Sequence, residues 1–198
     1  MQTFDVVIIG GGLIGCSIAF EFANEGLKII VLDKQEPGRE ASWAAAGMLS
    51  PAPEFPGDVP LVPLARASLE MYPDFVRAVE GESGKAAAYA QQGTIQIFLG
   101  ANAARERDDM LRQHGRLGLC AEAVSTTSAR RIQPSIPRAA SALAFLPNEA
   151  IVDPRLLMDA VLHAALRRGV LVRANCAVNS GPAHLTLFRF SAPRKQTA

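Results

Sequence analysis

The sequence predicts an α/β fold whose amino-terminal part is a parallel β-sheet. Residues 6–9 are a continuous apolar run, which predicts a parallel strand buried on both faces. Residues 28–32, of which the last four are apolar, predict a second buried strand. Between the two runs, apolar residues recur at helical spacing until Gly26, and the recurring positions are Ile14, Ile18, Ala19, Phe22 and Ala23. A strand, a crossover helix and a strand of this length form a right-handed parallel unit.

Further elements follow from apolar periodicity and from helix end signals. Asp153-Pro154 is a helix cap followed by a proline in the first turn, so a helix is expected from there to Gly169. A strand at 170–172 can then rejoin the sheet begun at Val6. The region 125–138 is polar and is assigned no helix or strand. The remaining predictions are a helix over about 64–79 that contains Pro73 and ends at Gly81 and Gly84, a half-buried strand of an antiparallel sheet at 93–99, a solvated helix at 101–116 and a short strand at 143–146.

Composition excludes several classes of partner. The 198 residues are 49% hydrophobic, enough for a buried core, and 20 Lys and Arg balance 19 Asp and Glu. This balance indicates a small-molecule ligand and argues against nucleic acid or an anionic membrane. The three cysteines lack CxxC or Cys/His spacing, so we expect no disulfide, no metal site and a cytoplasmic location. The first apolar run is broken by glycines well short of the roughly 18 residues that a membrane span needs.

A glycine motif follows the first strand. Gly10 allows a tight exit from the strand, Gly12 leaves room for a pyrophosphate, and Gly15 lets the helix lie close to the sheet. The helix start offers free N–H groups and a partial positive charge to phosphates. Asp33 ends the second strand 18 residues after Gly15, where a carboxylate can accept both ribose hydroxyls and would repel the extra phosphate of NADP. The motif predicts a dinucleotide site; a purely structural glycine turn is the alternative, and the motif does not separate FAD from NAD.

Residues 41–49 read Ala-Ser-Trp-Ala-Ala-Ala-Gly-Met-Leu. With the glycine motif and the acidic strand end, they resemble the D-amino-acid oxidase superfamily of flavoproteins, and most closely its glycine oxidase branch in thiamine biosynthesis. The resemblance continues more diffusely to about residue 178. It implies a Rossmann-like FAD-binding parallel sheet with an inserted α+β substrate-domain segment. The implied division is an FAD-binding domain at 1–85 and 150–180, a partial substrate domain at 86–149 and a divergent tail at 181–198.

The resemblance also implies which residues surround FAD. Leu13 and Ile14 would lie at the pyrophosphate turn, and Asp33 with Lys34 would flank the ribose. Val178 would close on the adenine, with a plain core valine as the alternative. Without the resemblance, residues 44–46 would be interpreted as part of a helix. The residues expected to approach the phosphates and the flavin, largely through their backbone, are Ala41, Ser42, Ala46, Gly47 and Met48.

The implied reaction is hydride transfer from the α-carbon of a small amine or amino acid to the flavin, followed by imine hydrolysis and reoxidation by oxygen to give peroxide. Glycine is the favoured substrate. The arginine and tyrosine that hold the substrate in this family come from the half of the enzyme beyond this chain, so no catalytic residue is assigned. The residues expected to be structural or solvated are Tyr72, Tyr89, His114, Arg130, Arg131, Arg138, Arg155, His163 and His184.

The sequence departs from the family pattern after residue 178, where Asn179-Ser-Gly-Pro begins a short, divergent end. We expect the carboxy-terminal half of the family fold to be missing, through truncation or a shifted reading frame. Such a product would bind FAD poorly, and its exposed apolar edges would favour association. Two alternatives remain: a non-catalytic dinucleotide-binding protein or partner subunit, and an NAD-dependent oxidoreductase of the same fold. Whether the chain forms homo-oligomers stays open.

Overall fold

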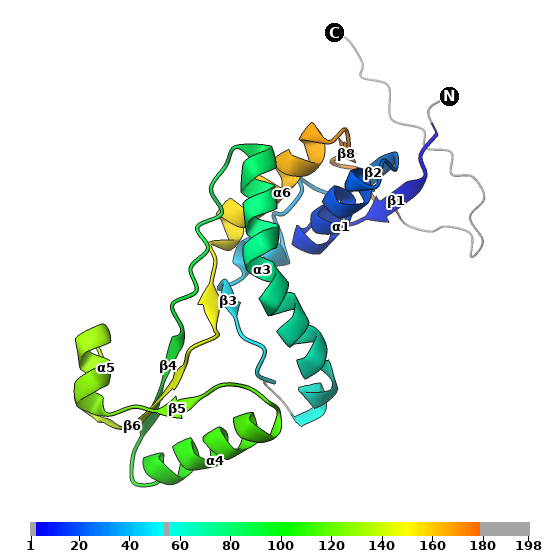
Figure 1. The fold of residues 1–198 in the computed structure, drawn as a ribbon. Helices are drawn as coiled ribbons and strands as arrows, with labels where there is room; N and C mark the ends of the chain where they lie inside the picture. Colours follow the sequence, from blue (N-terminus) through cyan, green and yellow to red (C-terminus); the bar gives the residue numbers. More distant parts are fainter. Residues whose placement is uncertain (1–2, 54–55, 179–198) are drawn as a thin grey trace.

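The computed structural model describes residues 3–53 and 56–178, which form two lobes joined along one long helix (Figure 1). The parallel-sheet lobe contains β1 (Val6–Ile9), β2 (Ile29–Leu32) and β8 (Leu171–Arg173) in the order β1-β2-β8, and both pairings are parallel. The predicted strand-helix-strand unit and the return of the later strand to this sheet are confirmed. The prediction that the first strand is buried on both faces is wrong: β1 lies at the edge of the described sheet, and Ile9 is 62% exposed.

Two helices pack together in the core of this lobe: α1 (Leu13–Asn24) and α6 (Pro154–Arg167). Phe20, Leu157 and Val161 are fully buried there. The expected apolar stripe of the first helix is partly wrong, because its buried residues are Cys16, Ala19 and Phe20. The face turned away from α6 and the sheet carries the exposed Ile14, Ile18 and Phe22.

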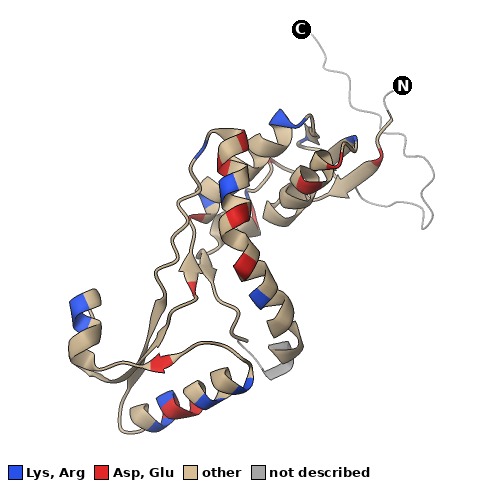
Figure 2. Cartoon of the chain, in the orientation of Figure 1, with Lys and Arg blue, Asp and Glu red and all other residues tan. Residues whose placement is uncertain are grey.

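The antiparallel-sheet lobe is built on β4 (Thr94–Leu99), β6 (Ala140–Leu146) and β5 (Glu122–Ala123), in the order β4-β6-β5. The antiparallel placement of the strand predicted at 93–99 is confirmed. Helix α4 (Ala103–Arg116) packs on this sheet, and charges of both signs follow its outer face (Figure 2). The predicted short strand at 143–146 is longer than expected, because its pairing with β4 continues back to Ala140.

The lobes are connected by α3 (Val62–Ser83), which follows η1 (Pro56–Leu61), and by two short segments that pair. Beyond α2 (Ala41–Ala44), β3 (Met48–Leu49) forms an antiparallel pair with β7 (Ala150–Ile151). Helix α3 begins earlier than predicted and continues through Gly81. It ends at Gly84, whose left-handed backbone (φ 70°) lets its N–H donate to the Glu80 carbonyl at 2.8 Å.

One helix lies in the region that was assigned no element. α5 (Thr126–Ile132) begins after Ser125, whose Oγ accepts a hydrogen bond from Ser128 N at 3.0 Å. Ala129 on its inner face is fully buried against the sheet. A capping serine and one small buried residue stabilise this short helix. A single buried alanine gives no apolar periodicity, so the sequence did not predict it. No helix of the described residues is long and apolar enough to cross a membrane.

Removing the cap of α6 tests how this helix begins. Asp153 Oδ1 accepts hydrogen bonds from Arg155 N at 2.9 Å and Leu156 N at 3.1 Å. Asp153→Ala should lower the free energy of unfolding by about 1 kcal/mol, measured by urea denaturation. Asp153→Asn keeps a capping oxygen and is the matched control. Equal stability of the alanine variant and the wild type would contradict the assigned cap.

Candidate dinucleotide site

The glycine turn joins β1 to α1 at the carboxyl edge of the parallel sheet. Gly10 has φ 103°, a backbone conformation that favours glycine, and its N–H donates to the Leu32 carbonyl at 2.8 Å. A Cβ on Gly15 would lie 2.0 Å from the Gly10 carbonyl oxygen. Glycine at both positions therefore lets the helix start directly against the end of the strand.

The first turn of α1 presents backbone donors without acceptors. Gly12 is its N-cap residue, offers no capping side chain, and is followed by no acidic residue in the first turn. Leu13 N donates to Ser42 Oγ at 2.9 Å. Within residues 3–53 and 56–178, the amides of Ile14 and Gly15 have no acceptor. These two N–H groups and the positive helix end are able to bind an anion.

Asp33 follows β2 and lies beside the turn. Its Oδ2 accepts a hydrogen bond from Gly11 N at 2.7 Å, and its Oδ1 accepts one from Gln35 N at 2.8 Å. Each carboxylate oxygen can accept a second hydrogen bond, so both remain able to bind ligand hydroxyls. The structure therefore places a fixed acceptor next to the free amides.

Ser42 reaches this turn from α2, a segment far from it in the sequence. Its Oγ accepts from Leu13 N, which leaves the hydroxyl proton to donate to another acceptor. Two guanidinium groups lie over the neighbouring Trp43 ring, with Arg39 Cζ 4.1 Å and Arg155 Cζ 4.7 Å from its centroid. Arg155 Nε also donates to the Trp43 carbonyl at 3.4 Å. These contacts hold α2 against the start of α6.

The other predicted residues of the 41–49 segment have no comparable contact with the turn. The exposed Ala41 opens α2, and the chain is extended at Ala45 (ψ 148°), so the interpretation of residues 44–46 as part of a helix is wrong beyond Ala44. Ala46 is exposed. Gly47 has φ 79°, and a Cβ there would lie 2.0 Å from the Val152 carbonyl oxygen. Met48 is 74% exposed on β3.

The two remaining predicted residues lie away from the amides. Lys34 pairs with Glu40 at 2.8 Å, and the hydrogen bond from its ammonium to that carboxylate raises the pKa of Lys34. Val178 is half-buried at the end of the described residues and belongs to none of their hydrophobic clusters. The structure thus brings together Gly10, Gly12, Leu13, Ile14, Gly15, Asp33 and Ser42, and it shows no such grouping for Lys34, Ala41, Ala46, Gly47, Met48 and Val178.

Cys16 contacts the glycine turn from the protein interior, a role that the sequence did not indicate. It is fully buried, and its Sγ donates to the Gly11 carbonyl at 3.5 Å. Burial, with a smaller contribution from the negative charge of Asp33, raises the pKa of the Cys16 thiol to about 12. The thiol therefore stays protonated at neutral pH and acts as a donor. Cys16, Cys120 and Cys176 all lie in the described residues, and each is a free cysteine.

Residues 5–184 match the DAO family, described as FAD dependent oxidoreductase. The chain belongs to this family. Its FAD dependence resolves the choice between FAD and NAD that the glycine motif left open.

Similar proteins include glycine oxidase from Geobacillus kaustophilus, which is 32% identical over 84% of this chain and 44% of its own length. The crystal structure of that organism's glycine oxidase superposes with a TM-score of 0.81 at 27% identity, covering 88% of this chain and 47% of the other. A bifunctional ThiO/ThiG protein from Synechocystis is 29% identical over 90% of this chain and 26% of its own length. The chain therefore spans less than half of the length of these relatives, and the predicted Rossmann-like α/β fold is confirmed.

A methyl group at Gly15 should disturb both the fold and the anion site. Because it would lie 2.0 Å from a backbone oxygen, Gly15→Ala should lose about 1–3 kcal/mol of unfolding free energy and bind FAD more weakly. Flavin fluorescence during titration and thermal unfolding measure the two effects. Gly81→Ala is the matched control, since Gly81 is also helical and has no atom within 4 Å of its added Cβ. Wild-type FAD affinity in Gly15→Ala would contradict the assigned role of the turn.

Loss of the Asp33 carboxylate should weaken FAD binding by about 1–3 kcal/mol, because charge-assisted hydrogen bonds to the ribose are lost. Calorimetric titration of Asp33→Ala with FAD measures this change. Asp5→Ala is the control, because Asp5 Oδ2 also accepts a backbone hydrogen bond, from Lys28 N at 2.8 Å, where β2 begins. That variant should lose stability but keep FAD affinity. An unchanged affinity in Asp33→Ala would count against the ribose assignment.

Proposed function

We propose that this chain carries the FAD-binding turn of an oxidase of small amines, with glycine as the favoured substrate. The proposal rests on two features of one turn. The Ile14 and Gly15 amides are free to donate, and the Asp33 carboxylate lies beside them because it accepts a hydrogen bond from Gly11 N. An anion and a hydroxyl donor held side by side are what the diphosphate and ribose of FAD provide.

Each group in the site has a distinct role in this proposal. The Ile14 and Gly15 amides donate to diphosphate oxygens, and the Ser42 hydroxyl donates to another. Asp33 accepts the ribose hydroxyls, while the side chain missing at Gly12 leaves space for the diphosphate. Further along the cofactor, the backbone of Ala46, Gly47 and Met48 would approach the flavin, Ala41 the phosphates, Lys34 the ribose and Val178 the adenine.

Bound FAD would supply the two-electron oxidation of the substrate C–N bond to an imine. Water hydrolyses the imine, and oxygen takes up the two electrons and two protons as peroxide. For glycine, one molecule each of water and oxygen is consumed, and glyoxylate, ammonia and hydrogen peroxide are formed. The resemblance of residues 41–49 to the thiamine-pathway branch supports a role of this oxidation in thiamine biosynthesis.

A spectroscopic and a catalytic measurement together test the proposal. The purified chain should take up a yellow flavin chromophore on titration with FAD, and a coupled peroxidase assay with glycine or sarcosine measures whether it also releases peroxide. The Asp33→Ala and Asp5→Ala variants serve as the binding-deficient and matched controls. A chain that binds FAD but forms no peroxide would support the second candidate, a non-catalytic dinucleotide-binding protein. A chain that does not bind FAD would contradict the cofactor assignment.

A further inference from the structure

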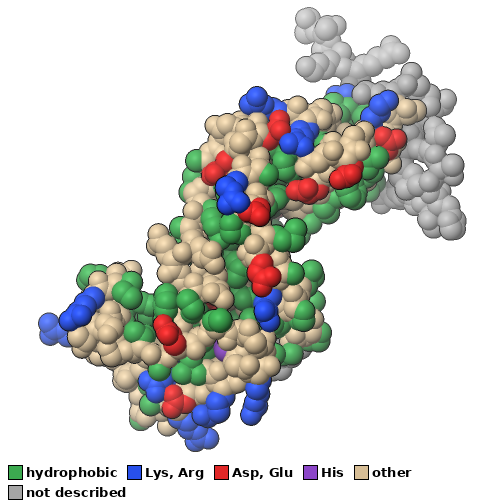
Figure 3. Space-filling view, viewed as in Figure 1, with side chains coloured by type: hydrophobic (Ala, Val, Ile, Leu, Met, Phe, Trp, Pro, Cys, Tyr) green, Lys and Arg blue, Asp and Glu red, His purple; other side chains and the backbone are tan. Residues whose placement is uncertain are grey.

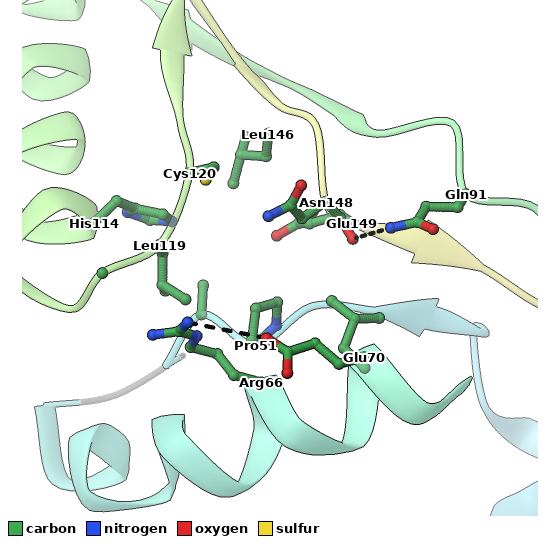
Figure 4. A pocket seen from close by; sticks show the side chains of 13 residues that line it. Pro51, Arg66, Glu70, Gln91, His114, Leu119, Cys120, Leu146, Asn148 and Glu149 are labelled. Carbon is green, nitrogen blue, oxygen red and sulfur yellow. Dashed lines mark hydrogen bonds and ion pairs between the residues drawn. The ribbon is translucent and has the colours of Figure 1, made fainter. Parts of the chain in front are cut away.

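A second site lies where the two lobes meet. A pocket of about 300 Å³, open on one side, is lined by the first half of α3, the connection from α4 to β5 and the segment after β6 (Figure 4). None of the residues assigned to the cofactor lines it. Its volume is at the lower end of the range for small-molecule sites, so the pocket fits a small ligand.

His114 contributes an unsatisfied polar atom to this pocket. The residue lies in the last turn of α4 and is only 7% exposed. Its Nδ1 is 3.1 Å from the Met110 carbonyl oxygen, and because a carbonyl only accepts, Nδ1 carries the proton. Nε2 is buried without a partner among the described residues, and the ring is directed toward the pocket in Figure 4. In the neutral ring this nitrogen is a free acceptor, which is costly to leave unpaired.

Glu149 supplies a carboxylate on another wall. It is 9% exposed, and its Oε1 accepts a hydrogen bond from the Ser50 hydroxyl. The ion pairs of residues 3–53 and 56–178 do not include it. Buried charges are normally paired, so this wall favours a positively charged ligand group.

Arg66 supplies the opposite charge from α3. Its Nη2 lies 3.9 Å from Glu70 Oε1, too far for a hydrogen bond, so with respect to the described residues the guanidinium keeps donors free for another acceptor. Glu70 is more exposed than Arg66, with 72% against 45% of the side chain in solvent, so water screens its charge more. A planar guanidinium binds carboxylates with two parallel hydrogen bonds. The pocket therefore combines a cation on α3 with a buried anion and a buried acceptor on its other walls.

We propose that this pocket binds a small α-amino acid. The ligand ammonium lies at the Glu149 carboxylate, on the side of the pocket that His114 lines, and the ligand carboxylate lies at Arg66. Pro51, Leu119 and Leu146 line the pocket with apolar surface, which suits an uncharged side chain. The inference goes beyond the proposed oxidation, because the residues of the glycine turn take no part in this pocket.

Histidine-detected NMR of the full chain tests the proposal with glycine, methylamine and acetate as probes. Glycine should shift the His114 ring signals, which are assigned by their loss in His114→Gln. Methylamine and acetate each lack one charged group and should bind about tenfold more weakly or worse. No shift of the His114 signals with glycine would overturn the proposal, and so would methylamine binding as tightly as glycine.

Two variants locate the ligand. Arg66→Gln and Glu149→Gln should each lower the glycine affinity about tenfold or more. Arg116→Gln and Glu106→Gln, at residues of α4 outside the pocket, should leave it unchanged. Because Glu149 is buried, circular dichroism first checks that Glu149→Gln folds like the wild type. Arg66 is partly exposed, so Arg66→Gln tests the pocket even if Glu149→Gln does not fold. Wild-type affinity in Arg66→Gln would overturn the proposal.

Titration with FAD on the same samples distinguishes the amino-acid pocket from the glycine turn. Arg66→Gln should bind FAD as the wild type does, because Arg66 lies outside the glycine turn. Loss of FAD binding in this variant would overturn the independence of the two sites. Loss of glycine binding with FAD binding retained would support the amino-acid pocket whether or not the chain releases peroxide.

Discussion

The close contact between the end of β1 and the start of α1 is the constraint on which the candidate site depends. A hydrogen atom in place of a side chain at Gly15 allows the helix to begin at the Gly10 carbonyl. This contact directs the free amides of α1 to the sheet edge where Asp33 follows β2. Cys16 reinforces the turn from inside, since its protonated thiol donates to the Gly11 carbonyl. Any shift of α1 would therefore separate the donors from the carboxylate.

The rest of the chain holds this arrangement in place through contacts between distant segments. Helix α6 packs against α1 and carries the chain to β8, which pairs with β2. Gly47 approaches the Val152 backbone closely, and its carbonyl accepts from Val152 N at 2.9 Å, which ties the 41–49 segment to the start of α6. Even so, hydrophobic side chains are exposed on the surface of both lobes (Figure 3). The dinucleotide site thus depends on the core that α1 and α6 share.

Features with a local cause could be predicted from the sequence. The strand-helix-strand unit and the Asp153 cap follow from apolar runs, glycine and proline positions, and short-range hydrogen bonds. The β3–β7 pair joins segments about a hundred residues apart and has only two residues in each strand, so no periodicity indicated it. The apolar residues that recur along α1 include an exposed face, because periodicity alone does not show which side of a helix is covered. Cys16 and His114 gain their roles from burial, which only tertiary packing determines.

The juxtaposition of donors and a carboxylate limits which ligands fit the glycine turn. A bare phosphate would gain hydrogen bonds from the Ile14 and Gly15 amides, but the negative charge of Asp33 beside them would repel it. A ligand that places hydroxyl groups next to its phosphate satisfies both, because the hydroxyls donate to Asp33 while the phosphate accepts from the amides. The same charge disfavours a second phosphate on the ribose. Selectivity at this edge therefore comes from the combination of backbone donors and one anion, and a flavin dinucleotide meets both requirements.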